Sequence, residues 1–158
     1  MFGFVTFAAL LLTAGGQTEG GAGAGMQPAV GSWMCSGTFA SGTPISANAT
    51  FTSVANGAAI VSTYDDVPPG QYHAAALFGM TAKGAQIESL IDASSGQRSF
   101  HGVPVAGGID YVNDDGSDRF AYRFGADSTL DIEYVVIKAG MEHPVDSLHC
   151  VHKASAAP

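Results

Sequence analysis

The sequence predicts an all-β domain, an antiparallel up-and-down barrel of about 8–10 strands. Short runs of alternating or β-branched residues follow one another along most of the chain, and turn residues separate them. No segment in this part shows the spacing of an amphipathic helix. With 158 residues and 46% apolar side chains, the chain is long enough to enclose one substantial core.

The expected strands are separated by recognisable turns. Residues 130–138 alternate apolar and acidic side chains at their start, which is typical of a strand with one solvated face. Asn56-Gly57 and Asp115-Gly116 each lie between two such runs, and these residue types tolerate the positive φ of a hairpin turn. The strands are expected at 32–39, 46–54, 58–64, 72–80, 85–92, 97–103, 109–112, 117–124, 130–138 and 147–153.

The charge balance restricts the partners of this domain. The chain has 6 Lys and Arg against 14 Asp and Glu, which gives a net charge of −8. A protein that neutralises phosphates needs clustered basic side chains, so we expect no nucleic-acid partner. No apolar run reaches the roughly 18–20 residues that a membrane-spanning helix needs, so we expect no stable membrane span once the leader described next is removed.

The first residues differ in composition from the rest of the chain. Residues 2–12 form an uncharged apolar run, and the small residues Thr13–Gly16 follow it. These match the apolar and cleavage regions of a secretory signal, which we assign to residues 1–16 and which predicts a secreted or periplasmic protein. No Lys or Arg precedes Lys83, so the basic start of such a signal is missing, and a buried apolar strand is the alternative.

Segments of small residues flank the predicted barrel. Residues 17–29 contain QTEGGAGAG, and we expect a flexible linker there because few large apolar groups offset the entropy of ordering. The barrel itself is predicted over residues 30–153, followed by a loose tail at residues 154–158. Seven of the 21 glycines precede residue 26, and most of the others fall where strands are expected to turn.

Gly31-Ser32-Trp33 opens the first expected strand and contains the only tryptophan of the chain. A Gly-x-Trp at this place resembles the start of the lipocalin and calycin barrels. The strings GSWMCSGTF and YDDVPPGQYHAAALFG resemble small secreted bacterial proteins with a lipocalin-like barrel. The resemblance covers residues 30–153 and implies a barrel in which Trp33 plugs one end. It implies no activity, because that group has no assigned function.

The two cysteines, Cys35 and Cys150, fall in the first and last expected strands. Those strands are neighbours in a closed barrel, so a disulfide between them is geometrically feasible. An even number of cysteines after an export signal favours the bridge. Two buried free thiols are the alternative.

The inward side chains of this barrel define a predicted cavity. We expect it to bind a small apolar molecule, because concave apolar sites with a few polar groups hold such ligands. The alternative is a structural or interaction module, since the same aromatic side chains can fill the interior as a solid core. The cavity candidates are Trp33, Phe51, Tyr72, Phe78, Phe120, Tyr122, Phe124 and Tyr134.

The sequence predicts no enzyme, metal site or cofactor. No GxSxG elbow, P-loop, HExxH or CxxC pattern is present. A haem-binding barrel is a further alternative, because some calycin-like barrels bind haem through one inward histidine. The candidate ligand is then His149 or His152 in the last strand, or else His101. His149 and His152 are three residues apart and lie on opposite faces of a strand, so they do not converge on one metal.

Overall fold

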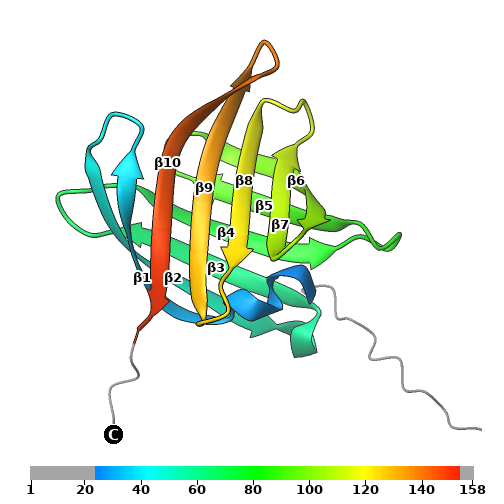
Figure 1. The fold of residues 1–158 in the computed structure, drawn as a ribbon. Helices are drawn as coiled ribbons and strands as arrows, with labels where there is room; N and C mark the ends of the chain where they lie inside the picture. The colour runs from blue at the N-terminus through cyan, green and yellow to red at the C-terminus, as the bar shows by residue number, and fades with distance from the viewer. Residues whose placement is uncertain (1–23, 154–158) are drawn as a thin grey trace, which may run out of the picture.

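A computed structural model describes residues 24–153, which form a closed barrel of ten antiparallel strands preceded by a short 3-10 helix (Figure 1). Each strand pairs with its neighbours in the sequence, and the first strand pairs with the last. The predicted up-and-down barrel is confirmed, and it is consistent with a lipocalin-like or calycin-like fold. The elements are η1 (Ala24–Ala29), β1 (Gly31–Phe39), β2 (Pro44–Val54), η2 (Ala55–Gly57), β3 (Ala59–Asp66), β4 (His73–Met80), β5 (Gln86–Asp92), β6 (Gly96–Val105), β7 (Gly108–Asn113), β8 (Asp118–Phe124), β9 (Thr129–Lys138) and β10 (Met141–His152).

The alternation of side chains builds the interior of the barrel. In β2 every second residue is buried, from Ile45 through Ala47 and Ala49 to Phe51, and most of the residues between them are exposed. This is the period of two that places successive side chains on opposite faces of a strand. The inward faces of the strands therefore share one core.

The turns follow the predicted chemistry. Asn56 and Gly57 between β2 and β3 have φ angles of 56° and 87°, and Gly116 between β7 and β8 has a φ of 72°. Both predicted hairpins are confirmed. The last strand differs from its expected bounds, since β10 begins at Met141 rather than at residue 147. Its first half contains Pro144, and the register shifts between Pro144 and Asp146, as a β-bulge allows.

One end of the barrel is closed by η1 and Trp33. Met26 and Ala29 of η1 are fully buried, and the indole N–H of Trp33 donates a hydrogen bond of 2.7 Å to the carbonyl of Ala29. The ring of His152 stacks on Trp33 with 3.8 Å between the centroids. Figure 1 shows η1 in blue at the lower end of the barrel. This end is therefore packed with side chains and covered by a helical turn.

Residues 24–29 depart from the linker that was expected over residues 17–29. They form η1, because burial of the Met26 side chain offsets part of the entropy that this Gly-containing segment loses on ordering. The folded domain therefore includes η1. The rest of the expected linker, the predicted signal over residues 1–16 and the tail at residues 154–158 lie outside the described residues.

A disulfide joins Cys35 of β1 to Cys150 of β10. The two residues are direct partners in the register of this strand pair, and both are buried. The predicted bridge is confirmed. Since it links positions 115 residues apart in the sequence, it ties the first strand of the barrel to the last.

We predict that replacing both Cys35 and Cys150 by alanine lowers the free energy of unfolding by up to about 4–5 kcal/mol, because the bridge restricts a long loop in the unfolded chain. Urea denaturation followed by Trp33 fluorescence measures the change. Reduction of the wild-type protein should produce most of the same loss. Equal stability of the oxidised wild type and the double variant would contradict this role.

A second prediction concerns η1. Met26→Ala should cost about 2–5 kcal/mol of unfolding free energy, because it leaves a cavity in the core. Gln27→Ala is the matched control, since Gln27 is exposed in the same turn and its loss should change stability by less than about 0.5 kcal/mol. Thermal or urea denaturation of both variants tests this. An unchanged midpoint for Met26→Ala would show that η1 does not contribute to the fold.

Candidate ligand cavity

A cavity of about 310 Å³ lies in the half of the barrel away from η1. Phe39 and Asp66, at the ends of β1 and β3, lie at its mouth together with Asp146 from the middle of β10. Deeper in the barrel the wall is largely apolar. It includes Ala49, Phe51, Ala76, Leu90, Ile132 and Leu148.

Five of the eight predicted cavity residues lie in this wall. They come from β2, from the segment before β4, and from β8 and β9, so the topology brings together side chains that are far apart in the sequence. The rings of Phe120 and Tyr134 stack with 4.6 Å between their centroids. The five residues are Phe51, Tyr72, Phe120, Tyr122 and Tyr134.

The other three predicted residues do not line the cavity. Trp33 and Phe78 are each 1% exposed, and Phe78 packs edge-on against Tyr111 and Tyr122. Phe124 is partly buried against the same core. The alternation of residues predicts that these side chains point into the barrel, but it does not predict their position along the barrel axis. They fill the half of the barrel that η1 closes. The barrel is thus solid at one end, as the alternative interpretation expected, and hollow at the other.

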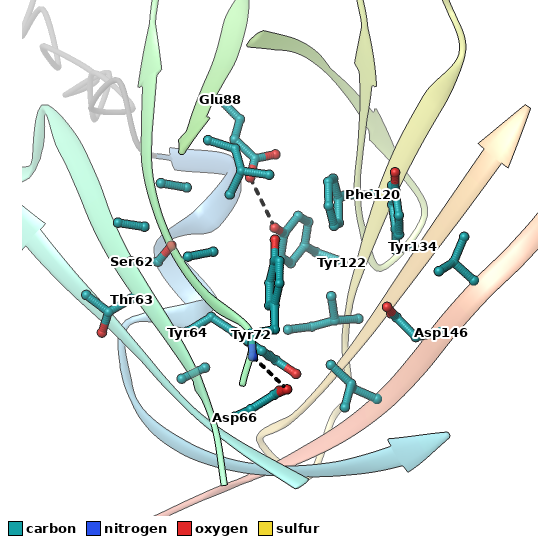
Figure 2. Close-up of a pocket in the computed structure, with 18 of the residues that line it drawn as sticks. Ser62, Thr63, Tyr64, Asp66, Tyr72, Glu88, Phe120, Tyr122, Tyr134 and Asp146 are labelled. Atoms are coloured by element: carbon teal, nitrogen blue, oxygen red, sulfur yellow. Dashed lines mark hydrogen bonds between the residues drawn. The ribbon is translucent and has the colours of Figure 1, made fainter. Parts of the chain in front are cut away.

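Glu88 of β5 places a carboxyl in the wall of the cavity, although it is only 1% exposed. The hydroxyl of Tyr122 donates to its Oε1 at 3.4 Å, and Oε2 has no hydrogen-bond partner. Figure 2 shows this carboxyl pointing toward Tyr122. Burial raises the pKa of Glu88 to about 8, although the hydrogen bond from Tyr122 and the charge of Arg98 act in the opposite direction. Glu88 is therefore mostly protonated at neutral pH.

The alternation in the sequence did not reveal Glu88. In β5 the apolar residue Ile91 points outward and is 57% exposed, whereas Glu88 and Asp92 point inward. Leu90 also points inward, so both faces of this strand carry apolar residues and the pattern does not distinguish inside from outside. The orientation could have been found only from its neighbours, since Glu88 pairs with Phe78 and Phe100, both of which are buried.

Arg98 of β6 is the basic residue of the lining, and the protein already compensates its charge. Its guanidinium lies 3.0 Å from Asp92 Oδ2 and 3.4 Å from Asp118 Oδ2. It also donates to the hydroxyl of Tyr134 at 3.2 Å. The same group lies over the ring of Phe120, 5.9 Å from its centroid, where the π-face attracts a cation.

Asp92 is held in its charged form. Burial acts to raise its pKa, but hydrogen bonds from Ser94, Ser95 and Arg98 outweigh burial and keep the pKa well below its usual range. The backbone N–H of Ser95 donates to Asp92 Oδ1 at 2.6 Å. Asp92 therefore remains a permanent anionic partner for Arg98.

A second acidic group lies at the mouth of the cavity. Figure 2 shows Asp66 and Asp146 at the end of the lining away from Glu88. Burial, together with the negative charge of Asp66, raises the pKa of Asp146 to about 6. Asp66 Oδ2 accepts a hydrogen bond of 3.1 Å from the backbone N–H of Tyr72. Two carboxyl groups thus share the entrance.

The three histidines considered as haem ligands, His101, His149 and His152, lie outside the cavity. Cys150 points inward, so its neighbour His149 points outward, where its Nδ1 lies 2.6 Å from Asp131. His101 is also on the outer face and pairs with Asp114. His152 stacks on Trp33 at the closed end. None of these residues lines the cavity, and the part of the chain described contains no group of three or more potential metal ligands.

Comparison of the chain with protein-family models and with curated proteins finds no match. Within residues 24–153, no helix is both long and apolar enough to cross a membrane.

The pH dependence of stability tests the burial of Glu88. Between its ordinary pKa of 4.5 and about 8, Glu88 is ionised in the unfolded chain but protonated in the folded protein, so its contribution to stability falls as pH rises. Glu88→Gln does not titrate at this position. We predict that the free energy of unfolding of this variant, compared with that of the wild type, increases by about 1 kcal/mol for each pH unit from about pH 5 to about pH 8.

Urea denaturation at several pH values measures this gain. Glu142→Gln makes the same chemical change at an exposed position of β10, where the side chain is 58% exposed. Its stability difference from wild type should show no such trend. Curves of the same shape for the two variants would contradict the buried, protonated state of Glu88.

Proposed function

We propose that this protein is a binding protein for a small, largely apolar molecule held in the open half of the barrel. The observation that supports this most directly is the cavity of about 310 Å³ with its mainly apolar wall. Ligand sites in proteins typically measure about 300–1,000 Å³ and combine such walls with a few polar groups. Because paired strands form the wall, the site is largely pre-formed, which reduces the ordering cost of binding.

We further propose that the protein acts outside the cytoplasm, as a secreted or periplasmic barrel. The disulfide between Cys35 and Cys150 supports this, since such bonds persist in oxidising compartments. The signal predicted over residues 1–16 and the resemblance to small secreted bacterial proteins point to the same compartment. A ligand taken up there would be a molecule from the surroundings of the cell or its envelope.

Filling the cavity tests the proposed function. Ala76 of β4 lines the cavity, so Ala76→Phe places a ring in the space for the ligand. With N-phenylnaphthylamine, a neutral apolar dye, we expect fluorescence enhancement by the wild type and an affinity at least about tenfold lower for Ala76→Phe, a loss of about 1.4 kcal/mol.

Leu77→Phe is the matched control, because Leu77 is the next residue of the same strand and lies on the outer face, 47% exposed. It should bind the dye as the wild type does. Circular dichroism confirms that both variants fold. A wild-type protein that leaves the dye fluorescence unchanged, or an Ala76→Phe variant with wild-type affinity, would contradict binding in this cavity.

A further inference from the structure

The lining of the cavity contains more acidic than basic side chains. Its lining contains three carboxyl groups, on Asp66, Glu88 and Asp146, and one guanidinium, on Arg98. Arg98 already contacts two carboxylates of the protein, so its charge is not available to a ligand. An anionic ligand would meet acidic side chains without a free basic partner, whereas a cationic ligand would meet charges of opposite sign.

Two side chains of the lining are only partly paired within the protein. The Nε of Arg98 is buried without a hydrogen-bond partner. Glu88 accepts a hydrogen bond from Tyr122 through one carboxyl oxygen only. Its Oε2 makes no hydrogen bond, although the side chain is 1% exposed. A buried polar atom in this state costs stability unless a donor reaches it, and such atoms call for a specific explanation. Glu88 is part of the cavity lining, so a donor on a molecule inside the cavity lies next to this carboxyl group. Phe120 and Tyr122 in the same wall provide aromatic surface for the apolar part of a ligand.

We propose that the ligand is an amphiphilic amine, with an apolar body against the aromatic wall and a protonated nitrogen that donates to Oε2 of Glu88. This inference rests on the proposed function and deepens it by naming the ligand class. Asp66 and Asp146 at the mouth would attract the cation during entry, and the net charge of −8 would raise its local concentration. A neutral alcohol could donate to Glu88 but would leave these charges unused.

Binding of the amine is coupled to the release of one proton. In the free protein the carboxyl of Glu88 keeps its proton at neutral pH. When the ammonium group arrives, the O–H bond of Glu88 breaks, the proton leaves to the solvent, and an N–H to carboxylate hydrogen bond forms. The charged or titratable groups that face Glu88 are Tyr122 on β8, Tyr111 on β7 and Arg98 on β6, while β4 contributes only Phe78.

These neighbours do not exchange protons near neutral pH. Burial raises the pKa of both Tyr111 and Tyr122 above the usual value for a phenol, and the charge of Glu88 raises each further. Arg98 stays protonated, with its pKa raised by Tyr134 and Asp92 despite burial. Glu88 is therefore the group that releases the proton, and amine affinity should increase about tenfold for each pH unit up to about pH 8 and then level off.

Isothermal titration calorimetry of the full chain with three probes of similar shape tests this proposal. Phenethylamine carries a positive charge, phenethyl alcohol none, and hydrocinnamate a negative charge. We expect the amine to bind at least about tenfold more tightly than the alcohol at pH near 8, and the acid most weakly. In buffers of different ionisation enthalpy, amine binding should release close to one proton near pH 7 and alcohol binding none.

Equal affinity for the amine and the alcohol, or amine binding without proton release, would overturn the inference and leave the proposed function intact. If neither the amine, the alcohol nor the neutral dye binds, the proposed function itself fails. The two failures are therefore distinguishable in the same set of titrations.

Two variants test where the nitrogen of the bound amine lies within the cavity. Glu88→Gln should abolish both the preference for the amine over the alcohol and the proton release, and Glu142→Gln should change neither. Asp146→Asn removes the acid that titrates near pH 6 at the mouth, so the pH dependence above pH 7 should persist in it. Loss of that dependence in Asp146→Asn would assign the nitrogen to the mouth and overturn the role of Glu88. If Glu88→Gln does not fold, proton release by the wild type decides the question.

Discussion

The closure of the sheet between β1 and β10 is the constraint on which the rest of the molecule depends. The two strands pair from Trp33 opposite His152 to Phe39 opposite Asp146, so neither strand presents a free edge to solvent. The disulfide lies within this seam and fixes which residues of β10 point inward. Because the ring is closed, its interior is shielded on all sides, and only the two ends remain to be covered or left open.

The two ends differ because the inward residues differ in size. At the closed end Trp33, Phe78 and Met26 fill the space, and η1 covers them. In the other half Ala49 and Ala76 occupy inward positions of β2 and β4, and the cavity lies against them. Interiors of proteins are normally packed without large voids, so small side chains in a rigid ring of strands leave volume that the backbone cannot collapse to fill. The distribution of large and small residues thus sets the depth of the cavity.

Much of the fold could be predicted from the sequence, and much less of the site. Turn pairs such as Asn56-Gly57 act locally, through the φ angles that these residues tolerate, so the hairpins and the order of strands followed from them. The direction of a side chain also depends on the neighbouring strands. In β5 the apolar Ile91 faces outward while Glu88 and Asp92 face inward, so periodicity alone assigned no role to either acid. The outward direction of His149 likewise depends on the seam with β1.

Two ionisable side chains of the cavity lining, Arg98 and Glu88, differ in a way that bears on function. The two terminal nitrogens of Arg98 contact two carboxylates and the hydroxyl of Tyr134, so its charge is compensated within the protein, although its Nε has no hydrogen-bond partner. Glu88 receives one long hydrogen bond from Tyr122 and leaves its second oxygen without a partner. A leucine at position 88 would complete the apolar wall without this cost. The acid weakens the folded protein in isolation, so the interaction that compensates it is to be sought in what enters the cavity.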